Sequence, residues 1–200
     1  MFYRPENGHG LRHNPFNAIV APRPIGWIST RGPAGDNLAP YSFFNAVAYT
    51  PPQVVFASTG RKPDTDDKDS VAQIAASGVF CVNIADAALA KVVNATSAHM
   101  PAGTSEFEAC GIEAARCETI DCPRVARAAA SLECRAARIL PLAGEANWLV
   151  IGVVTGVHLR DDCVVDSRFD PRPSGGGWVS RMGYRDWAAV TEIFEMERPA

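Results

Sequence analysis

The chain has 200 residues, enough for one domain with a sizeable core or for two small ones. Hydrophobic residues make up 47% of the chain, which is typical of a folded globular protein and argues against disorder. No apolar run approaches the ~18–20 residues of a membrane-spanning helix. The formal net charge is −3 and the basic residues are scattered, which argues against nucleic acid or an anionic membrane as a partner.

Residues 1–16, MFYRPENGHGLRHNPF, are polar and lack the apolar stretch of a signal peptide, so we expect a cytoplasmic protein. Disulfides are rare in that compartment, and the spacing of the six cysteines matches no common zinc pattern. We therefore expect incidental thiols and no metal site.

Residues 18–30, AIVAPRPIGWIST, are rich in β-branched and aromatic side chains, which favour a strand. Pro22 and Pro24 exclude a regular central strand, because proline cannot donate to a sheet ladder. A turn is expected over residues 32–36, and residues 37–49 are predicted to form a second, irregular strand.

Residues 53–58, QVVFAS, are predicted to be a short buried strand, and residues 59–68 a charged loop. A helix follows over residues 69–78, DSVAQIAASG, with Asp69 as its N-cap and Gly78 as its stop. The next strand is expected over residues 79–84.

Asp86 is expected to cap a second helix, whose buried face would carry Leu89, Val92, Val93 and Thr96. Ser105 and Glu108 form a capping-box pattern that predicts a short helical turn. Strands are expected over residues 131–140, 148–159 and 164–165. The sequence as a whole predicts a mainly β protein, a small antiparallel barrel with short helices, as a single domain over residues 1–200.

One arrangement predicts an anion site on physical grounds. A buried strand ends at Ser58, a basic loop with Arg61, Lys62 and Lys68 follows, and a helix then begins near Ser70. Free N–H groups at a helix start, hydroxyls and cations together suit a phosphate monoester. Three acidic residues, Asp64, Asp66 and Asp67, lie in the same loop and would repel a phosphate unless they faced outward, so taken alone this pattern fits an ordinary solvated loop better.

The segments NPFNAIVAPRPIGWIST, NLAPYSFFNAVAYTPPQVVFAS and KDS before a helix resemble the flavin reductase-like, FMN-binding split-barrel family. The resemblance is strongest over residues 14–84 and continues in SEFEACG, LECR, the strand near Gly152 and SRMGYRDW. It implies a Greek-key split barrel that forms a homodimer, with FMN near the subunit interface.

The resemblance also implies which residues bind FMN. Trp27, Ser29 and Thr30 match positions at the isoalloxazine or ribityl part, and Tyr41, Ser42, Phe43 and Asn45 match positions along the flavin. Ser58, Arg61, Lys68, Asp69 and Ser70 match the phosphate end, and Arg181 matches a position near the site. Ser70 stands where threonine is common and Trp187 where tyrosine is common, and neither departure removes a needed group.

Several of these positions have a structural alternative. Trp27 is equally suited to core packing, and because side chains alternate along a strand, one of Phe43 and Phe44 is expected in the core. By the same rule only one of Ser29 and Thr30 need face a cofactor.

Two loops are also left open. His99 is expected to be a solvent-exposed loop residue, although it could meet a substrate. The glycines at 175–177 suggest a mobile loop that could lie over the site.

The favoured function is an NAD(P)H-dependent flavin reductase that passes reduced FMN to a partner oxygenase. The cofactor would do the hydride chemistry, so no catalytic side chain is required. The alternatives are a flavoredoxin-like FMN electron carrier without nicotinamide turnover, and a non-redox flavin-binding barrel. The sequence does not choose between NADH and NADPH or name the electron acceptor.

Overall fold

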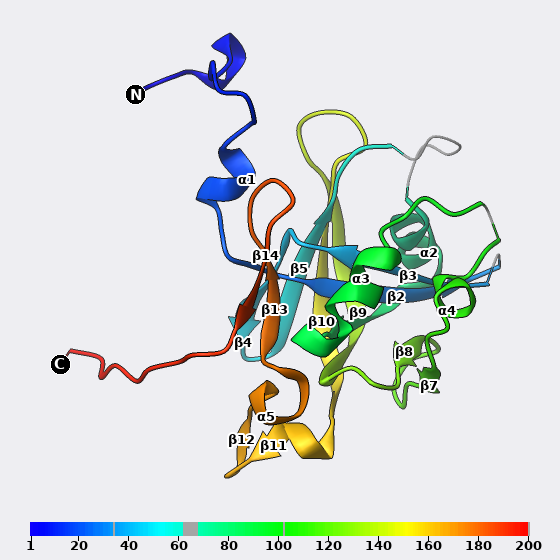
Figure 1. Ribbon diagram of the computed structural model, residues 1–200. Helices are drawn as coiled ribbons and strands as arrows, with labels where there is room; N and C mark the ends of the chain where they lie inside the picture. Colours follow the sequence, from blue (N-terminus) through cyan, green and yellow to red (C-terminus); the bar gives the residue numbers. More distant parts are fainter. Residues whose placement is uncertain (34, 62–67, 102, 200) are drawn as a thin grey trace.

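The computed structural model describes residues 1–33, 35–61, 68–101 and 103–199 (Figure 1). Its main element is a seven-stranded antiparallel sheet. The strands in chain order are β2 (Gly26–Gly32), β3 (Gly35–Tyr41), β4 (Phe44–Tyr49), β5 (Pro52–Ser58), β6 (Val79–Ile84), β9 (Ala130–Pro141) and β10 (Trp148–Leu159). Across the sheet their order is β3-β2-β6-β9-β10-β5-β4.

Three small sheets surround it: β1 (Arg23–Pro24) with β13 (Trp178–Arg181) and β14 (Trp187–Val190), β7 (Ala114–Arg116) with β8 (Pro123–Val125), and β11 (Val164–Val165) with β12 (Arg168–Phe169). The helices are α1 (Phe16–Ile19), α2 (Asp69–Ser77), α3 (Ala90–Ala95), α4 (Glu106–Ala109) and α5 (Arg172–Gly175). Short 3-10 turns are η1 (Pro5–Asn7), η2 (Ala87–Leu89) and η3 (Asp161–Cys163).

The sheet closes into a barrel because consecutive strands lie at its two edges. β3 pairs with β2 at one edge, and β4 pairs with β5 at the other. Only Ser42 and Phe43 connect β3 to β4, and such a link spans roughly 10 Å at most. The two edges must therefore approach each other, which rolls the sheet into the split barrel predicted from the sequence.

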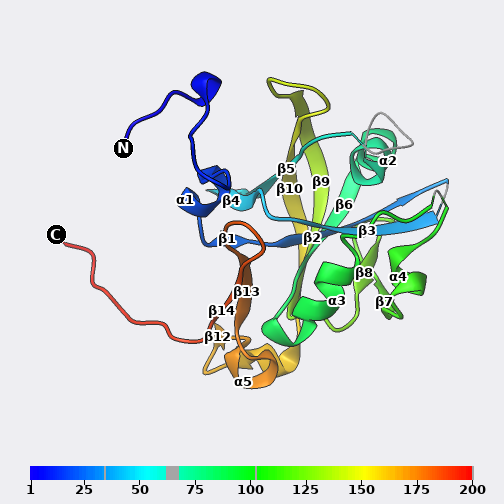
Figure 2. The ribbon, with the colours of Figure 1, turned by 45° about the horizontal axis from the view of Figure 1, so that its top comes forward.

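Two hydrophobic clusters fill the inside and cover the outside of this barrel. Ile28 points inward with Phe56 and Phe80, and all three are fully buried. Trp27 is the preceding residue, so it points to the opposite face, where it packs with Val93 of α3 beneath the outer helices. Figure 2 shows α3 and α4 on this outer side of β2 and β3.

Phe80 leaves no room for a side chain at position 152 of β10. A Cβ atom built at Gly152 would come within 2.4 Å of the Phe80 ring. This close approach explains the glycine inside the longest apolar run of the sequence.

Most strand predictions are confirmed. The strands over 79–84, 148–159 and 164–165 are found with the predicted bounds, the strand over 53–58 begins one residue earlier, and the strand over 131–140 is one residue longer at each end. The strand predicted over 18–30 is wrong at its start, where α1 and then β1 precede β2. The irregular strand predicted over 37–49 is two strands on opposite edges of the sheet.

The predicted helix caps have mixed outcomes. Asp86 caps η2 as predicted, because its carboxylate accepts a hydrogen bond from the Leu89 N–H at 3.2 Å. Asp69 is the first residue of α2 and not its N-cap, which is Lys68. Ser105 occupies the N-cap position of α4, but its buried hydroxyl has no hydrogen-bond partner among the described residues, so the predicted capping box is not formed.

The glycines at 175–177 pack against the body of the protein. Gly175 is the last residue of α5 and is buried so close to Asp86 that a Cβ atom there would lie 2.0 Å from the carboxylate. The segment therefore belongs to the packing around η2. None of the described helices is long and apolar enough to cross a bilayer.

Candidate functional site

A cavity of about 300 Å³ opens between β3, the start of α2 and the segment that follows α3. Five residues predicted as cofactor ligands line it: Tyr41, Arg61, Lys68, Asp69 and Ser70. They come from three separate parts of the sequence, and the closure of the barrel brings them together. Lys62 and the acidic residues Asp64, Asp66 and Asp67 of the same loop lie outside the described residues.

Tyr41 ends β3 with its ring in the barrel interior, 4.9 Å from the Phe56 ring between centroids. Its hydroxyl is buried and makes no hydrogen bond among the described residues. Burial raises the pKa of the Tyr41 phenol. The hydroxyls of Ser70 and Ser58 oppose this rise, although neither forms a hydrogen bond of ordinary geometry with the phenol. A buried hydroxyl without a partner costs free energy, so this group favours an added acceptor in the cavity.

A short chain of side chains fixes the hydroxyl of Ser70. Asn37 of β3 donates to the Ser70 Oγ at 2.9 Å and to the Thr30 Oγ1 at 3.3 Å. The Thr30 hydroxyl donates in turn to Gln73 Oε1 of α2 at 2.6 Å. Ser70 thus accepts one bond and keeps its own proton for donation. Asn37, which the sequence interpretation did not assign, therefore supports the site.

Positive charge gathers at the same end of the cavity. The Lys68 Nζ lies over the Tyr41 ring, 5.8 Å from its centroid. The Lys68 side chain is half-buried, and this partial desolvation lowers the pKa of its ammonium. Lys68 also precedes α2, whose first N–H groups have no acceptor within the helix. A hydroxyl pair, a cation and a helix start together form a site for a phosphate or another oxyanion.

Arg61 stands at the rim of this site. Its guanidinium forms an ion pair with Glu145 of the β9–β10 loop at 2.6 Å, and both side chains are exposed. An exposed ion pair of this kind is worth little, roughly 0–1 kcal/mol.

The opposite wall of the cavity is formed by the residues after α3 and by α4. Thr96 accepts a hydrogen bond from the Trp27 indole N–H at 2.9 Å and donates to the Val93 carbonyl. Glu106 is buried and accepts from the Leu38 N–H at 2.9 Å. His99 lies in an exposed loop, as expected, and also lines the cavity.

Four predicted ligands on β2 and β5, one of which is Thr30, are buried and do not line the cavity. Trp27 is fully buried with its N–H satisfied, which matches the core-packing alternative. Ser29 is fully buried and donates to the Pro123 carbonyl at 2.6 Å. Ser58 is 1% exposed, and its hydroxyl opposes the rise of the Tyr41 pKa.

The predicted ligands around the start of β4 lie on the surface of the single chain. Phe43 is 36% exposed, with the Arg23 guanidinium 5.7 Å from its ring centroid, while Phe44 packs against the interior cluster as the strand alternation predicted. Ser42 is half-buried. Asn45 is exposed, and its side-chain oxygen accepts from the next N–H of the chain. Arg181 pairs with Arg23 in the β1–β13 ladder and lines a second cavity.

Comparisons with known proteins identify the family and the fold of this chain. The sequence matches the family described as flavin reductase like domain over residues 20–170. An uncharacterized protein of Deinococcus radiodurans is 37% identical over 94% of this chain and 84% of its own length.

Two solved structures are similar in both sequence and fold. Nitrilotriacetate monooxygenase component B from Bacillus cereus is 29% identical, with a TM-score of 0.82 over 94% of this chain and 100% of that one. The 2-nitrobenzoate 2-nitroreductase NbaA of Pseudomonas fluorescens is 25% identical, with a TM-score of 0.79 over 92% of this chain and 88% of that one. The match over residues 20–170, together with the closed seven-stranded sheet, shows that this chain belongs to the flavin reductase-like family of split barrels.

Proposed function

We propose that this protein binds FMN and reduces it with NADH or NADPH, as a flavin reductase. The observation that carries the proposal is the cavity at the start of α2. There the unpartnered Tyr41 hydroxyl, the Ser70 hydroxyl and the partly desolvated Lys68 ammonium meet. Membership of the family supports a flavin cofactor in general. The cavity supports a flavin that ends in a phosphate.

The FMN phosphate is assigned to the end of the cavity beside α2. Lys68 neutralises charge there, Ser70 donates its free proton, and the N–H groups at the start of α2 complete the donor set. Arg61 joins them when it leaves Glu145. The carboxylate of Asp69 also lines the cavity, and it must face away from a bound phosphate.

The isoalloxazine ring is assigned to the segment that joins the two edges of the barrel. Ser42, Phe43 and Asn45 lie there on the surface of one chain, next to the cavity wall at Tyr41. A flat apolar ring needs cover on both faces, so this placement requires a second subunit to complete the site. Trp27, Ser29 and Thr30 are then assigned an indirect role, in which they stabilise β2. Trp27 also positions Thr96, and Thr30 positions Asn37, through their hydrogen bonds.

When bound, the flavin supplies hydride acceptance and onward electron transfer. The residues of the chain bind it, orient it and shield it, and reduced flavin would add a negative charge that favours nearby N–H donors and cations. The similarity to a component of a monooxygenase favours an oxygenase as the acceptor of reduced flavin.

The absorbance spectrum of the purified protein tests this function. We expect a flavin spectrum that bleaches when NADH or NADPH is added without oxygen, and catalytic NAD(P)H oxidation when free FMN is supplied. Tightly bound flavin without turnover would instead indicate an electron carrier. A protein that neither retains nor titrates with FMN would contradict the proposal.

A further inference from the structure

A second cavity, of about 470 Å³, lies between α3 and the β13–β14 hairpin. Its polar lining consists of Lys91 and Asn94 from α3, and Arg181 and Arg185 from the hairpin, with Trp187 as its aromatic wall. None of the described residues that line it is acidic. Three cations converge here on a protein whose formal net charge is −3, so the cluster is a local feature and not a reflection of composition.

Arg181 and Trp187 form a rigid, flat platform on one side of this cavity. The guanidinium lies 5.5 Å from the centroid of the Trp187 ring. It also donates to the carbonyls of Asp186 at 2.9 Å and Tyr184 at 2.8 Å, which fixes its orientation. A guanidinium held over an indole offers a surface on which an aromatic base can stack.

Lys91 and Arg185 supply the two other cations, and both are exposed. Neither forms an ion pair or a side-chain hydrogen bond within the part of the chain that the structure describes. Other arginines of the protein, such as Arg31 and Arg172, are paired with carboxylates. Two uncompensated cations beside a stacking platform favour a ligand that joins an aromatic base to a phosphate monoester.

We propose that this cavity binds the adenosine 2′-phosphate end of NADPH and so makes NADPH, and not NADH, the preferred hydride donor. The inference rests on the proposed flavin reductase function. The adenine would stack on the Arg181–Trp187 platform, and Lys91 and Arg185 would hold the 2′-phosphate. That phosphate adds about −1.5 to −2 charge, whereas NADH carries an uncharged hydroxyl in its place.

The position of the cavity is compatible with this role. Lys91 and Asn94 line it from α3, and Thr96, directly after that helix, lines the cavity assigned to FMN. The second cavity therefore lies at α3, and the first lies at the segment that directly follows this helix. A dinucleotide with one end in the second cavity would approach the flavin along this helix.

Steady-state kinetics with both coenzymes tests the inference. We expect the parent protein to show a lower KM for NADPH than for NADH. The double variant Lys91→Ala/Arg185→Ala should raise the KM for NADPH about tenfold, which corresponds to ~1.4 kcal/mol for the loss of both charge contacts. The KM for NADH should change far less. Arg127→Ala is the matched control, because it removes one exposed charge outside both cavities.

Direct binding separates this inference from the proposed function. Adenosine 2′,5′-bisphosphate should bind the parent more tightly than 5′-AMP in a calorimetric titration, and this preference should vanish in the double variant. Equal KM values for the two coenzymes in the parent, or a double variant that behaves like the control, would overturn the inference. If neither coenzyme is oxidised, the flavin reductase proposal fails, and the titration still decides whether the cavity recognises a 2′-phosphate.

Discussion

Lys68 is the residue on which the proposed phosphate site depends most. Its ammonium is partly desolvated and lies over Tyr41 at the cavity wall. A charge-assisted contact to phosphate is worth roughly 1.5–3 kcal/mol, so Lys68→Ala should weaken FMN binding about ten- to a hundredfold. Riboflavin, which lacks the phosphate, should bind the variant and the parent alike. Fluorescence titration with the two flavins measures this contrast.

The comparison of ligands is also the control for misfolding, because a damaged protein would lose affinity for both flavins. Lys68→Arg should recover part of the FMN affinity by restoring the charge. If Lys68→Ala, Ser58→Ala and Ser70→Ala all bound FMN like the parent, the phosphate would have to lie elsewhere.

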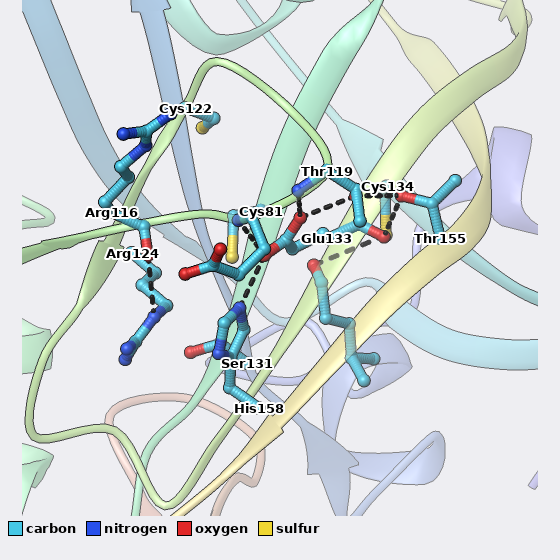
Figure 3. A network of polar contacts seen from close by, with 12 residues as sticks. Cys81, Arg116, Thr119, Cys122, Arg124, Ser131, Glu133, Cys134, Thr155 and His158 are labelled. Atoms are coloured by element: carbon cyan, nitrogen blue, oxygen red, sulfur yellow. Dashed lines mark hydrogen bonds and ion pairs between the residues drawn. The ribbon is translucent and has the colours of Figure 1, made fainter.

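Glu133 is a buried carboxylate outside both cavities (Figure 3). It accepts hydrogen bonds from the Glu118 and Thr119 N–H groups, from the Thr119 hydroxyl and from the His158 Nε2. Burial alone would raise the pKa of Glu133, but these bonds outweigh it and lower the pKa to about 2. The carboxylate thereby fixes the loop at 118–119 to β9.

The lowered pKa of Glu133 predicts a loss of stability in acid. Its pKa is about 2 in the folded protein and near 4.5 in the unfolded chain, so the contribution is complete above pH 4.5 and is lost as pH falls toward 2. The loss is on the order of 3 kcal/mol. Urea unfolding at several pH values should show Glu133→Gln less stable than the parent at pH 7 and the difference narrowing below pH 4.5. A constant difference across that range would contradict this role.

At the scale of elements, Asn83 joins four strands through one fully buried side chain. Its amide nitrogen donates to the Trp27 carbonyl at 2.9 Å and to Ser29 Oγ at 3.1 Å. Its amide oxygen accepts from the Val125 N–H at 2.8 Å and from the Ser131 hydroxyl at 3.0 Å. These partners lie on β2, β8 and β9, and Asn83 itself is on β6.

Asn83→Leu should therefore destabilise the barrel, because it leaves buried polar groups on three other strands unpaired. We expect a loss of about 2–4 kcal/mol, which lowers the Tm of a protein of this size by roughly 5–15 °C. Ser131→Ala removes only one of the four bonds and should cost about 1 kcal/mol. Thermal unfolding followed by circular dichroism measures both. Similar Tm values for the two variants would show that the network does not act as a unit.

The elements that local patterns specify were predictable from the sequence. β6 and β10 are continuous apolar runs bounded by turn residues, and their bounds were predicted correctly. The failures depend on distant partners. Nothing local in residues 37–49 shows that β3 pairs at one edge of the sheet and β4 at the other.

The same distinction holds for the candidate site. Lys68 and Ser70 were predictable because a strand, a basic loop and a helix start follow one another in the sequence. Asn37 and Thr96 were not, because their contacts to Ser70 and Trp27 exist only after the barrel has closed. The burial of Trp27 also follows from tertiary packing, since its position on β2 suits either the core or a cofactor.

For the whole molecule, the distribution of exposed apolar side chains argues for a partner subunit. β4 is an edge strand, and its Val47 and Tyr49 are 55% and 92% exposed. Phe16 and Ile19 of α1 are 58% and 70% exposed. An uncovered, apolar sheet edge is a site for association, which monomers avoid.

We therefore expect a homodimer that covers β4 and α1, with an interface above ~2,000 Å² in total. Sedimentation velocity at micromolar concentration should show a dimer for the parent and a monomer for Val47→Asp/Tyr49→Asp, because burial of two carboxylates without partners opposes association. Val164→Asp, a similar exposed change on β11, should leave the dimer intact. A monomeric parent would contradict this assembly.

Because Phe43 and Asn45 lie at the start of β4, the monomeric variant should also bind FMN less tightly while keeping the phosphate site at α2. FMN and riboflavin should then lose affinity by similar factors, the opposite of the pattern expected for Lys68→Ala.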